Sequence, residues 1–158
     1  MAPAYVDPAV LQRRIDTLNW AQRQYSLAES RAVLAQDKYE EAIKQMDRLK
    51  GILADVERKE SLAGDEVDAA RASVQLQNNP RVPQQFQQQV REELAFRQKQ
   101  FEFAMSRVYT AKENYERSIR EVDRLRDLWL EFESIRVRLA DDVKSAQEAV
   151  RVQRLPGR

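Results

Sequence analysis

Apolar side chains recur at alternating three- and four-residue intervals along almost the entire chain. In the first half the series begins at Leu18 and ends at Val74, and in the second half it begins at Leu94 and ends at Val150. A 3-4 spacing kept over about seven heptads is typical of a coiled-coil helix and not of a short helix on a globular core. We therefore predict two long α-helices, residues 8–78 and 84–153, each with one apolar seam.

The two seams differ in their polar interruptions. The first is apolar except at Glu60 and consists of Leu18, Ala21, Tyr25, Ala28, Ala32, Ala35, Tyr39, Ala42, Met46, Leu49, Leu53, Val56, Glu60, Ala63, Val67, Ala70 and Val74. The second consists of Leu94, Arg97, Phe101, Ala104, Val108, Ala111, Tyr115, Ser118, Val122, Leu125, Trp129, Phe132, Arg136, Leu139, Val143, Ala146 and Val150. Glu60 and Arg136 stand at equivalent places, and two explanations stay open for them. Their long stems can reach water from a narrow seam, or the two side chains pair between chains and fix the register of a dimer.

The two halves of the chain also resemble each other. KYEEAIKQMDRL at 38–49 returns as NYERSIREVDRL at 114–125, an offset of 76 residues. Extended without gaps, residues 18–77 align with 94–153, and about a third of the positions are identical. Self-similarity of a coiled coil alone would favour offsets that are multiples of seven, and 76 is not one. The pattern therefore predicts an internal duplication.

The segment between the copies predicts a tight turn. Asn-Asn-Pro disfavours helix before Pro80, and Pro83 suits the first turn of a new helix. Asp7 before Pro8 is a candidate N-cap. We divide the chain into an N-terminal extension at 1–7, the helix at 8–78, a turn at 79–83, the helix at 84–153 and a tail at 154–158. The fold class is all-α, a long antiparallel two-helix coiled-coil hairpin, with a swapped dimer as the open alternative.

A turn centred near residues 80–81 also predicts which residues face each other. It places Trp129 opposite Ala32, Phe132 opposite Ala28, Leu139 opposite Ala21, and Leu125 opposite Ala35. It further places Glu60 near Phe101, and Arg136 near Tyr25. Large side chains then meet small ones, which is how close-packed layers are filled.

Composition narrows the class of partner. Charged residues make up 34% of the chain, yet the formal net charge is only +1, so no strong field attracts nucleic acid or an anionic membrane. The basic clusters, QRR at 12–14 and the tail RVQRLPGR, are small. No signal-peptide core and no membrane-length apolar stretch occur, so we expect a cytoplasmic protein, with export lacking a cleavable signal left open.

The residue types needed for catalysis are missing from the sequence. It contains neither histidine nor cysteine, which removes the commonest general base and the commonest transition-metal ligands. The acidic pairs Glu40/Glu41, Asp65/Glu66 and Asp141/Asp142 are adjacent in sequence, so their side chains diverge around a helix. Gly51 and Gly64 are isolated and form no phosphate loop. We expect no enzyme activity, no cofactor, no metal and no small-molecule substrate.

Apolar residues off the seams predict a binding surface for another protein. The stretch LWLEFESIRVRL at 128–139 is apolar nearly all round, unlike its counterpart in the first copy. A contiguous apolar patch usually marks a partner surface, and a two-helix pair has little interior of its own. Phe96 and Phe103 form a smaller group nearer the turn. We predict binding to a protein partner or to a second copy, as a homo-oligomer, through Leu27, Val33, Leu34, Leu128, Leu130, Ile135 and Val137.

Two long stretches, AESRAVLAQDKYEEAIKQMDRL and FEFAMSRVYTAKENYERSIREVDRLRDLW, resemble the FliJ and YscO family of flagellar and type III secretion systems. The likeness is in the alternation of Ala, Arg or Glu, and Leu along two helices. It implies a small cytosolic stalk protein that docks to the central pore of a hexameric export ATPase and to export-gate or chaperone partners. A non-catalytic adaptor or stalk, and a subunit of a helical scaffold or filament, are the functions that the sequence favours.

Overall fold

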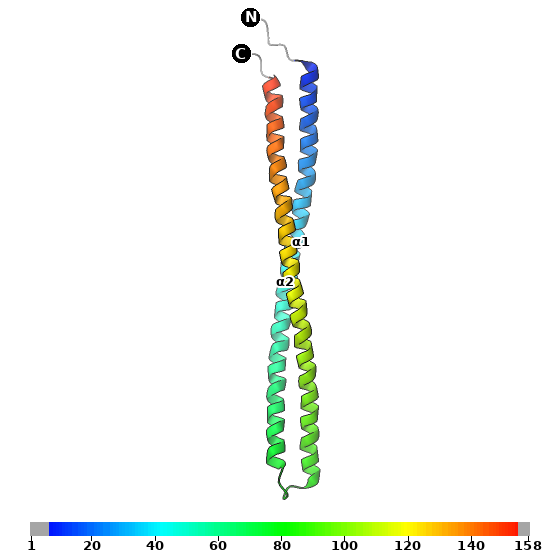
Figure 1. The fold of residues 1–158 in the computed structure, drawn as a ribbon, viewed down its shortest axis with the longest axis vertical. Coiled ribbons are helices and arrows are strands. Elements are labelled where there is room, and N and C mark those ends of the chain that lie inside the picture. The colour runs from blue at the N-terminus through cyan, green and yellow to red at the C-terminus, as the bar shows by residue number, and fades with distance from the viewer. Residues whose placement is uncertain (1–6, 155–158) are drawn as a thin grey trace. The chain divides into compact units, whose positions relative to one another are not determined.

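The structure, a computed structural model, describes residues 7–154 and consists there of two long helices that pack against each other (Figure 1). Helix α1 spans Pro8–Gln77 and helix α2 spans Gln84–Arg154, and no strand occurs in the described range. The predicted spans were 8–78 and 84–153. Apart from Asp7 and Arg154, the predicted extension at 1–7 and tail at 154–158 lie outside the described residues.

Helix α1 begins with the predicted cap. The Asp7 carboxylate accepts a hydrogen bond of 2.9 Å from the amide of Ala9, and the Asp7 carbonyl accepts one of 3.0 Å from the amide of Leu11. Pro8 occupies the first helical position, where a missing N–H leaves no intrahelical bond unmade. The start of the helix is therefore fixed by local chemistry.

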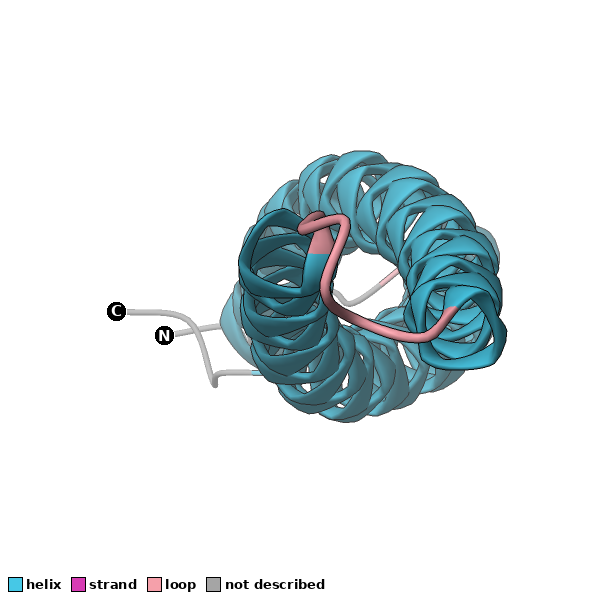
Figure 2. Ribbon diagram, turned by 90° about the horizontal axis from the view of Figure 1, so that it is seen from below, coloured by secondary structure: helices cyan, strands magenta, loops and turns pink. Residues whose placement is uncertain are grey.

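A short loop at residues 78–83 joins the end of α1 to the start of α2 (Figure 2). The Asn79 side chain accepts from the amide of Arg81 at 3.0 Å, and the Asn79 carbonyl accepts from the amide of Val82 at 2.9 Å. The Gln87 side-chain amide donates to the carbonyls of Asn79 and Val82. The loop is thus bound to the first turn of α2.

The chain divides into two compact units, and the first combines the beginning of α1 with the end of α2. Unit 1 comprises Met1–Ala42 and Val122–Arg158. Within it, Arg14 donates to the carbonyl of Ala149 at 2.9 Å, and the ring of Tyr39 stacks on Trp129 with centroids 5.6 Å apart. Residue numbers rise along one helix as they fall along the other, so the two helical segments of unit 1 are antiparallel (Figure 1).

Unit 2, Ile43–Glu121, contains the end of α1, the loop and the beginning of α2. Val56 and Val108 are buried in one cluster with Ala111, against which Leu53 packs. Nearer the loop, Arg97 on α2 donates to Glu66 on α1 at 2.9 Å. The two helical segments of unit 2 are therefore also antiparallel.

Burial confirms both predicted seams. Every residue assigned to a seam is buried or half-buried, and each buried apolar residue in the described range belongs to a seam. These residues are Ala21, Ala28, Ala32, Ala35, Val56, Val67, Ala70, Val108, Ala111, Val122, Leu125, Ala146 and Val150. The 3-4 spacing therefore identified the packing face of each helix.

Two contacts lie a few residues away from the predicted facing pairs. Trp129 stacks on Tyr39, whereas the prediction placed it against Ala32, and the ring of Phe101 lies against Gly64, four residues beyond the predicted neighbour Glu60. Seam positions recur every seven residues, so interlocking layers accept only registers that keep this phase. The midpoint of the loop therefore does not determine which residues of the two helices face each other. The hydrogen bonds from Gln87 hold the loop against α2.

Arg136, one of the three charged seam residues with Glu60 and Arg97, is bonded within the chain. As predicted it lies beside Tyr25, whose hydroxyl accepts from its guanidinium at 3.4 Å. The guanidinium also donates to both carboxylate oxygens of Glu133 one turn away, so the stem lies in the seam and the charge reaches its edge. Glu60 is half-buried in unit 2.

Candidate protein-interaction surfaces

The seven residues predicted to bind a partner all belong to unit 1, but they differ in exposure. Leu27, Val33, Leu34, Leu130 and Val137 are each about half exposed, between 46% and 56%. Leu128 and Ile135 are only partly accessible because they flank the seam. The first five are therefore available for a partner, whereas the last two also contribute to packing within the pair.

Unit 2 carries an open groove between its two helices. Two adjoining depressions share Val56, Phe103 and Arg107 and extend along α2 from Phe96 to Asn114. Phe103 is 62% exposed and Phe96 is 51% exposed, so aromatic rings seven residues apart form one wall. The floor of the groove reaches the edge of the seam at Val56.

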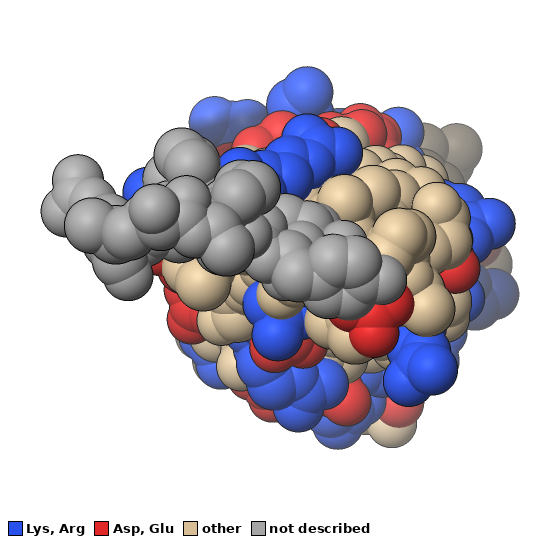
Figure 3. All heavy atoms as spheres, turned by 90° about the horizontal axis from the view of Figure 1, so that it is seen from above, with Lys and Arg blue, Asp and Glu red and all other residues tan. Residues whose placement is uncertain are grey.

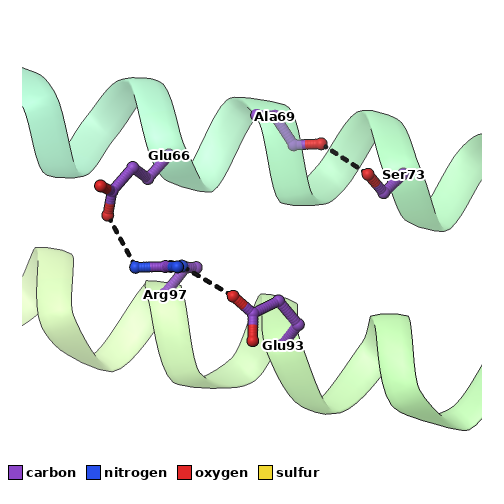
Figure 4. A network of polar contacts seen from close by, with 5 residues as sticks. All are labelled: Glu66, Ala69, Ser73, Glu93 and Arg97. Atoms are coloured by element: carbon purple, nitrogen blue, oxygen red, sulfur yellow. Dashed lines mark hydrogen bonds and ion pairs between the residues drawn. The ribbon is translucent and has the colours of Figure 1, made fainter.

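Charged side chains of both signs border the groove. Arg97 lies between Glu93 on its own helix, at 2.8 Å, and Glu66 across the seam, at 2.9 Å (Figure 4). Lys59 pairs with Asp55 at 3.1 Å, one turn away on α1. The guanidinium of Arg107 lies 5.8 Å from the centre of the Phe103 ring.

The groove of unit 2 shows which residues of unit 1 share a side of the helix pair. Under the 76-residue offset, its lining residues Phe96, Phe103, Thr110, Ile52 and Lys59 correspond to Trp20, Leu27, Leu34, Leu128 and Ile135. Those five residues hold the same places relative to their seams and therefore form the groove flank of unit 1.

The remaining predicted residues lie on the other side of unit 1. Val33, Leu130 and Val137 correspond to Tyr109, Ala54 and Ser61, none of which lines the groove. The seven-residue patch is therefore two surfaces, the groove flank and an opposite flank. A prediction based only on distance along the helix could not separate them, because each flank depends on position around the helix.

Sequence reasoning missed Trp20, which belongs to the groove flank and is 57% exposed. Trp20, Leu27 and Leu34 are spaced seven residues apart, and each directly precedes a seam residue. This spacing could have identified Trp20 from the sequence. It also missed the contribution of Leu62 and Arg107 to the groove of unit 2. Because the groove draws residues from both helices, it depends on a register that the sequence had not provided.

Charged side chains of both signs are interspersed over the surface that Figure 3 shows. Among residues 7–154, no three acidic side chains gather in a way that would hold a metal ion. No buried side-chain nitrogen or oxygen within this range is left without a hydrogen-bond partner. Neither described helix is long and apolar enough to cross a membrane.

Comparison with known proteins found no matching family model, no matching curated protein and no matching solved structure.

Proposed function

We propose that this chain is a non-catalytic coiled-coil interaction protein, an adaptor or stalk that presents apolar flanks of a helix pair to another protein. The observation that carries the proposal is the exposure of large aliphatic side chains on both flanks of unit 1. Leu34 on the groove flank is 56% exposed, and Leu130 on the opposite flank is 51% exposed. Both lie beside a seam whose own apolar residues are covered.

The energetics favour association through these flanks. Complete burial of one Leu or Val side chain contributes about 1.5–3 kcal/mol, and these side chains retain about half of that contribution. Several of them covered together would supply several kcal/mol, from which the cost of ordering two molecules is subtracted. The seam itself buries mostly Ala and Val, so an additional interface would add apolar burial that the helix pair lacks.

Site-specific photocrosslinking in the cells that make the protein tests this proposal. A benzophenone amino acid at position 34 or 130 is expected to form a crosslink to another polypeptide, either a second copy or a different protein. The same group at the exposed Asp68 of unit 2, which belongs to neither flank, serves as the control. Crosslinking no stronger than at Asp68 would contradict the proposal.

Replacing the exposed apolar side chains by polar ones tests the same proposal through loss of the association. Leu130→Gln with Val137→Gln removes exposed side chains and should leave helicity unchanged while weakening the association. Adding Leu128→Gln and Ile135→Gln should also reduce stability, because these two side chains are half-buried. Circular dichroism and sedimentation measure the two effects separately.

A narrower proposal rests on the resemblance to the FliJ and YscO family, namely a cytosolic stalk of a type III or flagellar export ATPase. Secretion genes next to the gene for this chain would support it. The other candidate, a scaffold or filament subunit, is favoured by apolar surface on both units. Concentration-dependent fibres or sheets in electron micrographs would support that role.

A further inference from the structure

The cluster in unit 2 shows which residues of the two helices face each other. Val56 and Val108 are buried together, and Leu53 packs there beside Ala111. Because the helices are antiparallel, each step toward the loop on α1 is matched by an equal step toward the loop on α2. Seam residues recur every seven positions, so similar layers would form again if α1 moved along α2 by one heptad. Such a movement is about 10.5 Å long.

The loop can close the helix pair in the present register and in the next one. By the count from Val56 and Val108, the last residue of α1, Gln77, faces Gln87, three residues after the start of α2 at Gln84. If α1 moved one heptad toward the loop, Gln77 would lie four residues beyond that start. The loop at 78–83 would then close an overhang of about 6 Å in place of about 4.5 Å. Six residues span about 20 Å when extended, so the loop is long enough for either overhang.

The same movement would bring two charged seam residues together. In the present register Glu60 faces Ala104, whose side chain offers it no hydrogen bond. After the movement Glu60 would face Arg97, one heptad nearer the loop on α2. Arg97 would keep its bond to Glu93 on its own helix. It would exchange Glu66, whose side chain is 53% exposed, for the half-buried Glu60, and a pair with less water around it is stronger.

The seam of unit 1 has similar layers in both registers. By the same count Trp129 faces Ala35, and after the movement it would face Ala28, which is also buried. A large side chain of α2 therefore meets a small one of α1 in either case. The stack of Tyr39 on Trp129 would be broken, which favours the present register.

We propose that α1 slides by one heptad against α2, so that the chain occupies two registers, the present one and a shifted one in which Glu60 faces Arg97. Because each helix is continuous, the slide displaces α1 along α2 in both units. The groove of unit 2 takes residues from both helices, so the two registers present different grooves. A partner that binds one of these grooves selects one register. The slide is a property of the chain alone and does not depend on the proposed function.

Disulfide trapping in the full chain tests the slide, because the sequence contains no cysteine of its own. Three variants combine Leu53→Cys with Ala111→Cys, with Ala104→Cys or with Ser118→Cys. The first pair is in contact in the present register, and the second would be in contact in the shifted one. The third would meet only after an equal slide in the opposite direction. A disulfide requires Cα atoms about 4.4–6.8 Å apart, so a displacement of one heptad prevents its formation.

The rates of disulfide formation are measured in dilute solution, and only the product with the mass of one chain is counted. The pair with Ala111→Cys is expected to close fastest, which also shows that chains carrying Leu53→Cys fold. The pair with Ala104→Cys should close several times faster than the pair with Ser118→Cys, whose rate measures unspecific opening of the helices.

The charge of Glu60 provides a second measurement. Glu60→Gln should slow the Ala104→Cys disulfide about fivefold relative to the Ala111→Cys disulfide, because the pair with Arg97 exists only in the shifted register. Glu57→Gln, at an exposed position of α1 outside the seam, is the matched control and should leave this ratio unchanged.

Two results would overturn the proposal. One is an Ala104→Cys disulfide that forms no faster than the Ser118→Cys disulfide. The other is a ratio that Glu60→Gln changes no more than Glu57→Gln does.

Discussion

Unit 1 and unit 2 fill the same kind of seam with different side chains. On α1, unit 1 buries Ala28, Ala32 and Ala35, and Ala32 is only 2% exposed. Unit 2 instead buries Val56 and Val108 in one cluster. Under the 76-residue offset, Val108 corresponds to Ala32 and Val56 corresponds to Phe132. Two medium side chains in one unit therefore stand where the other has a small one and a large one.

The difference between the units shows how a constant pattern produces different surfaces. In unit 1 the large residues Trp129 and Phe132 are on α2, and aliphatic side chains extend on both flanks beside them. In unit 2 the ring of Phe101 lies against Gly64, and the neighbouring aromatic residues line an open groove. The seam determines pairing, whereas residues outside it determine what each unit can bind.

The largest expected effect is the loss of the aromatic stack between Tyr39 and Trp129 in unit 1. Trp129→Ala removes a half-buried ring that stacks on Tyr39, and should lower the free energy of unfolding by about 2–3 kcal/mol. Trp20→Ala, the matched control at an exposed site, should change it by less than about 0.5 kcal/mol. Urea unfolding followed by circular dichroism measures both. Equal effects would mean that Trp129 is not part of the seam.

Replacing Ala32 and Phe132 of unit 1 by valine, the residue at both corresponding positions of unit 2, sharpens the comparison. Phe132→Val alone should cost about 1–2 kcal/mol because it leaves a cavity, and Ala32→Val alone should cost about 1 kcal/mol by overpacking. The double variant should cost less than their sum by at least about 0.5 kcal/mol. Ala21→Val, further along the same seam, should add independently to Phe132→Val. If the free-energy costs of Ala32→Val and Phe132→Val simply add, Ala32 and Phe132 do not share a layer.

The seams could be predicted from the sequence because each seam position is specified by local spacing. The facing pairs could not, because the loop midpoint and the heptad phase disagree, as the Tyr39–Trp129 stack shows. The exposure of five of the seven predicted residues followed from their places outside the seams, but the division of the patch into two flanks required knowing how the helices meet. Of the residues that line the groove, only Phe96 and Phe103 had been singled out from the sequence as an apolar group, because the other wall of the groove comes from α1.

Alanine substitutions at the two helix-interior glycines of unit 2 should change the stability by smaller amounts, which differ between the two sites. Nothing lies within 4 Å of the position that a Cβ on Gly51 would take, so Gly51→Ala should stabilise the chain by about 0.5–1 kcal/mol. At Gly64 the same atom would lie 3.3 Å from Cε2 of Phe101. Gly64→Ala should therefore gain less, and thermal unfolding of the two variants measures the difference. A larger gain at Gly64 would contradict the close packing of Phe101.

The smallest effect concerns charge at equivalent sites of the two units. In unit 1 the hydrogen bonds from Arg136 lower the pKa of Glu133 below its ordinary value. The corresponding residues of unit 2 are Glu57 and Glu60, which carry like charges. A lowered pKa gives stability that is present above the ordinary glutamate pKa and is lost as the pH falls through the lowered value. Glu133→Gln should therefore lower the melting temperature at neutral pH and have no effect in strong acid; an equal effect at both would contradict the pairing.

The most direct test of the antiparallel helix pair is the distance between spin labels at positions 36 and 126, which lie beside the seam on the two helices of unit 1. Pulsed electron paramagnetic resonance of the doubly labelled chain, diluted with excess unlabelled chain, should give a short distance, on the order of 20 Å, because neighbouring helices lie about 10 Å apart. The short distance should survive dilution if both labels belong to one helix pair of one chain. A separation approaching the length of a 70-residue helix, on the order of 100 Å, or a short distance that disappears on dilution, would contradict pairing within the chain.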